Sequence, residues 1–200
     1  MKKKALRKEF RTEIRKSLNR FLSILFIVAL GVMIFAGVHA SAPDMRATGD
    51  YYFDLTNLMD LRVISTLGIT EDDLKSIGEI EGIQSVYGSY MEDVYCQEAD
   101  SQEVLHFEAI LEDMNELTVE EGRLPEKAGE CFLDSEYARE FGYAVGDTLE
   151  IQVDSEDDST LIRRSYTISG YGYSPNYISF VRGSTTLGTG SLSGFVYVLP

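Results

Sequence analysis

Cysteine and proline are scarce in this sequence of 200 residues, which has two cysteines and four prolines. So few cysteines exclude a small scaffold held together by disulfides, and so little proline excludes a collagen-like chain. Hydrophobic residues make up 44% and charged residues 26% of the chain, close to the average of globular proteins, which excludes a wholly disordered chain. The length is typical of about one domain.

Basic residues are also few, 18 against 33 acidic ones, and half of them lie at one end of the chain. Residues 1–20 hold nine basic and two acidic residues, a formal charge of +7. Residues 21–42 hold no charged side chain, whereas residues 43–200 hold nine basic and 31 acidic residues, a formal charge of −22. This order indicates a protein anchored in a membrane, and the negative body argues against nucleic acid or anionic lipid as its partner.

The uncharged run FLSILFIVALGVMIFAGVHASA covers residues 21–42 and is 22 residues long. A transmembrane helix needs roughly 20 apolar residues, so this run is long enough to span a bilayer. Because Lys and Arg cluster before it, the positive-inside rule places the N-terminus in the cytoplasm and the acidic body outside the cell membrane. A signal peptide cleaved after Ala40 or Ala42 is the alternative, but its apolar core is normally only about 7–15 residues long, so we expect the helix to be retained.

Apolar residues recur every four positions in the basic segment before the span: Leu6, Phe10, Ile14 and Leu18. This spacing predicts an amphipathic helix that lies in the membrane interface, which makes membrane lipid an expected partner. The alternative is that the basic charge only sets the topology.

We expect residues 43–200 to form an α+β extracytoplasmic domain after a polar linker over residues 43–50. The expected elements are a strand at 61–65, a helix from the N-cap Thr70 to Gly82 with Asp73 at N3, a long strand over 83–96 and a strand over 104–111. The first three elements predict a βαβ-type unit.

The most specific block of the sequence covers residues 122–151. It contains Gly122-Arg123-Leu124-Pro125, then Gly129-Glu130, a strand, a short helix over 134–142 that ends in Gly, and Val145-Gly146-Asp147-Thr148-Leu149. This order resembles the extracytoplasmic core domain of FtsX-like ABC permeases, the macrolide-exporter and lipoprotein-release type. The resemblance implies a β-hairpin-rich subdomain, in which the strand entered at 145–151 pairs with a strand at 166–171. A last strand is expected over 194–200.

The resemblance extends over essentially the whole chain and implies the N-terminal part of an ABC transporter permease. Its parts are then a cytoplasmic basic helix over 1–20, a transmembrane helix over 21–42 and a core domain over 43–200, with a split into two subdomains expected near 115–125. In that family a separate cytoplasmic ATPase drives movement of the outer domain, so an ATPase subunit and a second permease copy or subunit are expected partners. Permeases of the family continue into at least three more transmembrane helices, so we expect a longer protein. The alternative is a single-pass, membrane-anchored binding or sensor module.

No motif indicates catalysis, a cofactor or a metal site. No Lys follows a Gly, which excludes a P-loop, and Gly188, Gly190 and Gly194 fit neither a dinucleotide-binding fingerprint nor a nucleophile elbow. The acidic run 154–158 lacks the Gly and Glu of an EF-hand loop, and His39 and His106 lie far apart. We therefore predict no catalytic, cofactor-binding or metal-binding residue and no enzymatic activity, which leaves a secreted enzyme without support.

Two features leave alternatives open. Cys96 and Cys131 would face an oxidising compartment, so they either form a disulfide or remain two buried thiols. The tyrosines around Pro175 are either a contact surface or ordinary strand residues: Tyr166, Tyr171, Tyr173 and Tyr177.

Overall fold

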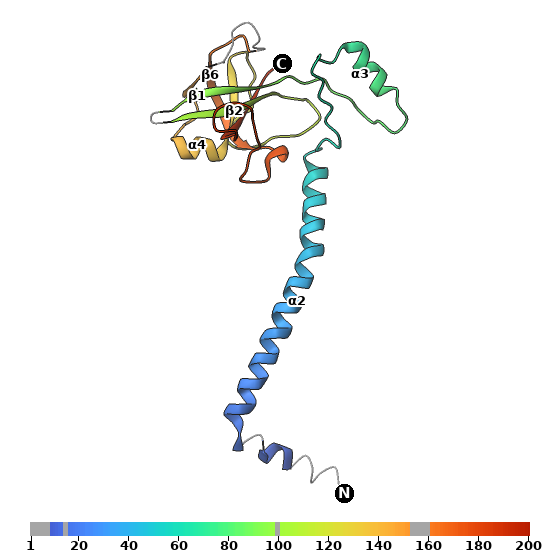
Figure 1. Cartoon of the computed structure of the whole chain (residues 1–200), viewed down its shortest axis with the longest axis vertical. Coiled ribbons are helices and arrows are strands. Elements are labelled where there is room, and N and C mark those ends of the chain that lie inside the picture. The colour runs from blue at the N-terminus through green and yellow to red at the C-terminus, as the bar shows by residue number, and fades with distance from the viewer. Residues whose placement is uncertain (1–8, 14–15, 99–100, 153–160) are drawn as a thin grey trace. The chain divides into compact units, whose positions relative to one another are not determined.

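The computed structural model describes residues 9–13, 16–98, 101–152 and 161–200 (Figure 1). The chain divides into two units, Met1–Tyr52 and Phe53–Pro200, and each is described by itself. Much of the predicted amphipathic helix, residues 1–8 and 14–15, lies outside the described residues, and residues 9–13 are helical.

Helix α2 runs from Leu18 to Leu55 and has no buried side chain. It contains the whole uncharged run, its most apolar window has a mean hydropathy of 2.8, and it is long and apolar enough to cross a membrane. The predicted linker over residues 43–50 is wrong, because the helix continues through Pro43. Proline removes one backbone donor and crowds the carbonyl of His39, but Met45, Arg46 and Ala47 after it all favour helix.

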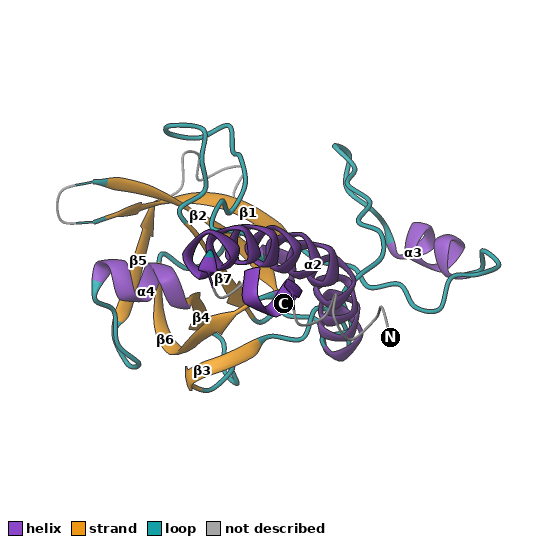
Figure 2. Cartoon of the chain, turned by 90° about the horizontal axis from the view of Figure 1, so that it is seen from below, coloured by secondary structure: helices purple, strands orange, loops and turns teal. Residues whose placement is uncertain are grey.

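The second unit, which we call the β-body, is built on a seven-stranded sheet in the order β3-β6-β4-β7-β2-β1-β5 (Figure 2). The strands are β1 (Met91–Gln97), β2 (Gln102–Ala109), β3 (Thr118–Gly122), β4 (Glu130–Asp134), β5 (Thr148–Gln152), β6 (Ser165–Tyr173) and β7 (Gly194–Val198). Strand β5 also pairs with β6, so all strands except β3 form a closed ring. Closure satisfies the backbone groups that an open sheet would leave unpaired at its edges, and β3 remains outside the ring on one edge of β6.

The interior of this ring is the main hydrophobic core. Successive side chains of a strand point to opposite faces of the sheet, so only alternate residues enter this core. In β4, Cys131 and Leu133 lie in this core, whereas Phe132 belongs to a second cluster with Phe195 and Tyr197 of β7. The main core contains Val94, Cys96, Leu105, Phe107, Cys131, Leu133, Tyr137, Ala138, Leu149, Ile151, Tyr166, Ile168 and Val196. The second cluster is covered by Tyr177 of the short 3-10 helix η1 (Pro175–Tyr177), among others.

The predicted α+β class and several elements are confirmed. Helix α4 (Ser135–Phe141) starts at the N-cap Asp134 and ends at Gly142, which has a φ of 75°. Strands β5 and β6 form the expected antiparallel hairpin, and β2 and β7 lie close to where strands were expected. Helix α3 (Glu71–Gly78) has the predicted capping box between Thr70 and Asp73, although it ends at Gly78 rather than at Gly82.

The predicted βαβ unit is wrong. Residues 61–65 form no strand, and β1 begins only at Met91 instead of near residue 83. The side chains of Leu61, Val63 and Ile64 are 79%, 64% and 66% exposed. β-Branched residues favour strands chiefly through packing against neighbouring strands, and no described strand pairs with this segment.

Candidate functional site

Residues 56–59, which follow α2 directly, are hydrogen-bonded to residues 113–116 beyond β2. The N–H of Glu116 donates to the carbonyl of Thr56 over 2.8 Å, and the N–H of Asn115 donates to the carbonyl of Asn57 over 3.0 Å. In return, the N–H of Met59 donates to Oδ1 of Asn115 over 3.0 Å. We call residues 56–59 and 113–116 the entry clamp.

Two asparagines give the entry clamp its shape. Asn57 and Asn115 have positive φ values of 46° and 55°, a left-handed conformation that asparagine tolerates better than most residues. The Asn57 side-chain amide donates to the carbonyl of Asp113, and Thr56 and Asn115 are only 4% and 5% exposed. The clamp therefore fixes the first residues after α2 to the β-body.

Replacing Asn115 with alanine is expected to open the clamp. The change leaves the Met59 N–H without its acceptor and places a less tolerant residue in a left-handed conformation, which together cost about 2–3 kcal/mol. Hydrogen exchange of the Met59 amide should become faster. Asn115→Gly removes the same acceptor without the backbone strain, so it should cost less; unchanged protection of Met59 in both variants would show that the clamp is not held by this side chain.

The two halves of the Gly-Arg-Leu-Pro and Gly-Glu motif meet in space. Arg123 donates from Nη1 to Oε2 of Glu130 over 2.8 Å and from Nη2 to Oε1 over 2.6 Å. The Glu126 N–H also donates to Glu130, over 2.9 Å. These bonds lower the pKa of Glu130 to about 2, and the hydrogen bonding to Arg123 makes the largest contribution. The motif thus closes the turn between β3 and β4 and has a structural role.

Glu130→Gln is expected to destabilise the protein at neutral pH but not in strong acid. Because the folded-state pKa of Glu130 is depressed from its usual value near 4.5 to about 2, its stabilising contribution is present above about 4.5 and is lost as the pH falls towards 2. The free energies of unfolding of the wild type and Glu130→Gln, measured with denaturant, should therefore converge as the pH falls over this range. Glu126→Gln, which alters a 69% exposed carboxylate 3.8 Å from Arg123, is the control and should show little difference at any pH.

Ionic groups also cover the outer face of β1 and β2. Nη2 of Arg62 lies 2.6 Å from Oε1 of Glu108, whose side chain is 6% exposed, so a second contact fixes the chain after the clamp. Nδ1 of His106 lies 2.5 Å from Oδ1 of Asp93. Burial opposes ionisation of Asp93, but hydrogen bonds from His106 and Thr185 outweigh it and lower the pKa of this carboxyl. His106 therefore has an acidic partner, and no group of three metal-binding side chains occurs among the described residues.

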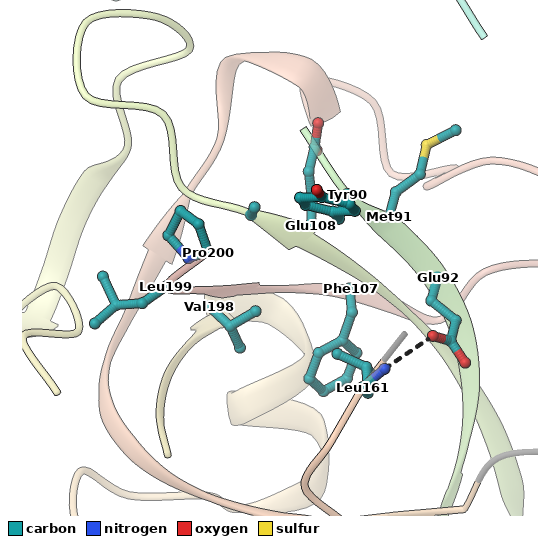
Figure 3. Close-up of a pocket in the computed structure, with 10 residues that line it drawn as sticks. Tyr90, Met91, Glu92, Phe107, Glu108, Leu161, Val198, Leu199 and Pro200 are labelled. Atoms are coloured by element: carbon teal, nitrogen blue, oxygen red, sulfur yellow. Dashed lines mark hydrogen bonds between the residues drawn. The ribbon is translucent and has the colours of Figure 1, made fainter. Parts of the chain in front are cut away.

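A cavity of about 390 Å³ lies at the end of the closed ring of strands where β1 begins and β2 and β7 end (Figure 3). Its lining is mostly apolar: Tyr90, Met91, Glu92, Phe107, Glu108, Ala109, Leu161, Val198, Leu199 and Pro200. Figure 3 shows the Phe107 ring beside Leu161, whose N–H donates to the Glu92 carboxylate over 3.3 Å. The volume is in the range of small-ligand sites.

Residues 21–199 match a protein family described as the MacB-like periplasmic core domain. The chain belongs to this family. The predicted resemblance to the outer domain of FtsX-like ABC permeases is thereby confirmed. No curated protein matches the chain.

Two solved structures are similar to this MacB-like chain. The first is the extracellular domain of the noncanonic ABC-type transporter YknZ from Gram-positive bacteria, with 12% identity, a TM-score of 0.42, and coverage of 68% of this chain and 64% of that one. The second is the periplasmic region of MacB from Actinobacillus actinomycetemcomitans, with 14% identity, a TM-score of 0.34, and coverage of 64% and 63%. The chain thus spans less than two thirds of the length of either structure.

The tyrosines of this MacB-like domain do not form one surface. Tyr166 packs in the core with its ring 5.4 Å from that of Phe107, and Tyr177 stacks on Phe195 at 4.8 Å. Tyr171 donates to Glu121, and Tyr173 accepts from Arg139 over 3.1 Å. They are ordinary fold residues. The acidic run 154–158 lies outside the described residues.

Cys96 and Cys131 are both free and buried, so the structure has two thiols and not a disulfide. They lie on β1 and β4, which are separated by two strands in either direction around the ring. Burial raises the pKa of each thiol to about 12.

Both thiols of the MacB-like domain are therefore expected to resist alkylation at pH 8 in the folded protein, because the thiolate is the reacting form. Mass spectrometry should show no adduct before unfolding and two after it. A cysteine introduced at the exposed Thr118 is the positive control. Rapid labelling of either native cysteine would contradict the buried positions.

Proposed function

We propose that this chain is the N-terminal part of an ABC transporter permease, in which ATP hydrolysis by a separate cytoplasmic subunit moves the β-body through α2. One observation carries the proposal: the apolar run continues as unbroken helix to Leu55, and the next residues are held in the entry clamp. In the proposed mechanism, movement of the helix reaches the β-body through this connection. The membership of the MacB-like family supports the same role.

The length of α2 fits a helix that leaves the membrane. Its 38 residues correspond to about 57 Å at ~1.5 Å per residue, whereas the hydrocarbon core is about 30 Å thick. We place residues 21–42 in the bilayer, residues 43–55 outside it as the helical extension, and the rest of the chain in the extracytoplasmic core domain. In the proposed mechanism this helical extension, which lacks the backbone donor of Pro43, transmits the displacement.

The charge distribution supports the orientation. Residues 1–20 carry +7 and residues 43–200 carry −22, so the positive-inside rule places the N-terminus in the cytoplasm. There the basic segment would contact anionic lipid and the ATPase subunit. A second permease copy or subunit would complete the transporter, and the catalytic residues for ATP hydrolysis would belong to the ATPase.

The first test is purification of the full-length gene product from detergent-solubilised membranes. An ATP-binding subunit should co-purify, and deletion of residues 2–20 should abolish this association. Extraction of the intact protein without any ATPase would contradict the proposal.

The second test concerns coupling through α2. Replacing Met45, Arg46 and Ala47 with three glycines should interrupt the helix outside the membrane, while three alanines at the same positions should preserve it. Thiol labelling of a cysteine at Thr118 should change on ATP addition with the alanines and not with the glycines. The same ATP response in both variants would show that α2 does not transmit the movement.

The cavity in Figure 3 favours a second candidate, a membrane-anchored module that binds a small apolar ligand. This function requires no ATPase. Tyr90 lines the cavity and is 70% exposed. Binding of an apolar fluorescent probe that is lost on Tyr90→Asp, together with no co-purifying ATPase, would favour it over the permease.

A further inference from the structure

Two buried polar atoms on β2 have no hydrogen-bond partner, and they are the only such side-chain atoms in the part of the chain that the structure describes. They are Nε2 of His106 and Oε2 of Glu108. The two residues are two positions apart on one strand, so their side chains lie on the same face of the sheet. Buried polar groups in proteins are almost always hydrogen-bonded, so this pair of atoms requires a physical explanation.

Each of these two residues is bound through its other polar atom to a charged partner. Nδ1 of His106 lies 2.5 Å from Oδ1 of Asp93 on β1, and Oε1 of Glu108 lies 2.6 Å from Nη2 of Arg62. We call these four residues the charged row: Asp93, His106, Glu108 and Arg62. The row connects β1 and β2 to the segment that follows the entry clamp, and its one interruption is between His106 and Glu108.

A single proton determines whether this interruption can close. Burial opposes ionisation of Asp93, but hydrogen bonds from His106 and Thr185 outweigh it and lower the pKa of this carboxyl. Because the Asp93 carboxylate is an acceptor, a neutral His106 ring carries its hydrogen on Nδ1. Its Nε2 is then an acceptor without a hydrogen, as is Oε2 of Glu108, so the two atoms cannot bond. A second proton, on Nε2, makes this atom a donor.

The spacing and the burial of the two side chains favour such a bond. Alternate residues of a strand are about 6.8 Å apart at ~3.4 Å per residue, a separation that an imidazole and a glutamate side chain can bridge together. The side chains of His106 and Glu108 are only 12% and 6% exposed. A hydrogen bond between them would therefore be shielded from water, which strengthens it.

We propose that His106 is a proton-dependent link of the β-body: when its ring takes up a proton from the surrounding solution, Nε2 donates to Oε2 of Glu108 and completes the charged row. The charges along the completed row alternate in sign, and charge-assisted hydrogen bonds are the stronger kind. Glu108 is then held from both sides, and it fixes Arg62 and the segment after the clamp more firmly to β2. This link is a property of the β-body and is independent of the ATPase in the proposed function.

The other titratable groups beside the row do not offer an alternative. Tyr177 of η1 lies edge-on to the His106 ring at 6.4 Å, and Tyr197 lies on β7, which pairs with β2. Burial raises the pKa of both tyrosines, so they remain protonated. Arg182, which follows η1, is bound to Asp134. Histidine is the residue type that normally exchanges a proton between pH 5 and 8.

Spin labels at positions 64 and 118 of the full-length protein in lipid bilayers test the proposal. Ile64 is 66% exposed and lies two residues after Arg62, and Thr118 is an exposed residue of β3, so neither label disturbs the core. The distribution of distances between the labels is recorded at about pH 5 and at about pH 8. Its width reports how firmly the segment after the clamp is held.

Three variants separate the role of Nε2 from other effects of acid. His106→Asn keeps an N–H near the position of Nδ1 but has no atom at that of Nε2. His106→Gln instead places an amide N–H near the position of Nε2 at any pH. His39→Gln is the control, because it removes the other histidine of the 200-residue sequence.

We expect the distance distribution of the wild type and of His39→Gln to be narrower in acid than at about pH 8. The distribution of His106→Asn should be broad at both pH values, because the row stays open, and that of His106→Gln should be narrow at both. Equal widths at the two pH values in the wild type, an unchanged acid response in His106→Asn, or loss of the response in His39→Gln would each overturn the proposal.

Discussion

Replacing Arg182 with alanine is expected to lower the free energy of unfolding by about 3–5 kcal/mol, because it leaves the buried carboxylate of Asp134 without its charge partner. The two side chains are almost fully buried and form two hydrogen bonds of 2.6 and 3.0 Å. Denaturant unfolding of the purified protein measures the effect. Of the ion pairs in the described part of the β-body, this one is the most deeply buried.

The exposed pair between Arg139 and Glu120 provides a matched control, since its side chains are 54% and 34% exposed. Arg139→Ala should have a much smaller effect, as exposed ion pairs contribute little to stability. A double variant, Asp134→Asn with Arg182→Met, should recover part of the lost stability, because it removes both charges and retains the cap of α4. Equal effects of Arg182→Ala and Arg139→Ala would refute the argument.

The loss of stability caused by Arg182→Ala should also depend on pH. Burial raises the pKa of Asp134, and the Arg182 guanidinium opposes that rise. Without it the folded-state pKa should rise further. A carboxyl whose folded-state pKa is raised contributes stability that is present below its unfolded pKa and is lost as the pH rises through the folded value. The deficit of the variant should therefore shrink in acid.

The elements that sequence predicted correctly are those defined by neighbouring residues. The capping box of Thr70 and Asp73 and the helix between Asp134 and Gly142 depend on contacts within a few positions. The hairpin after Gly146, which pairs Thr148 with Thr167, was expected only from the family resemblance. The uncharged run of α2 is equally local. Such features form wherever the segment is placed, so their residues suffice to predict them.

The errors concern segments whose structure depends on distant partners. The β-branched residues at 61–65 predicted a strand, yet a strand needs a neighbour to complete its hydrogen bonds, and composition does not reveal one. The opposite error occurred at 43–50, where polar side chains indicated a linker although their backbone continues the helix. Polarity reports solvent exposure, and an exposed helix is as polar as a loop.

The candidate sites were the least predictable part. The entry clamp joins Asn57 to Asn115, and the ion pair joins Asp134 to Arg182, 48 residues apart, so neither has a local pattern. Only the pairing of Arg123 with Glu130 left a signal, since both belong to one recognisable motif. Its structural role was not apparent from the sequence, because the turn that joins them depends on β3 and β4.

The first residue of that motif leads to the second large effect. Gly122→Ala is expected to cost about 3 kcal/mol or more. Gly122 has a φ of 80°, which costs a residue with a Cβ about 1–2 kcal/mol. A Cβ there would also lie 2.7 Å from Cα of Gly170 and against the carbonyl oxygen of Ser169, an overlap with backbone that costs a further ~1–3 kcal/mol.

Gly142 separates these two contributions, because it has a φ of 75° but no neighbouring atom within 4 Å of the place that a Cβ would take. Gly142→Ala should therefore cost only the backbone strain, about 1–2 kcal/mol. Thermal unfolding compares the two variants, and equal losses would show that β6 can move away from Gly122. Since β6 is the one strand in the described residues with which β3 pairs, the overlap in Gly122→Ala should first release β3 from β6. Its earliest sign should be faster hydrogen exchange of the Arg123 amide, which donates to Ser169 over 2.9 Å.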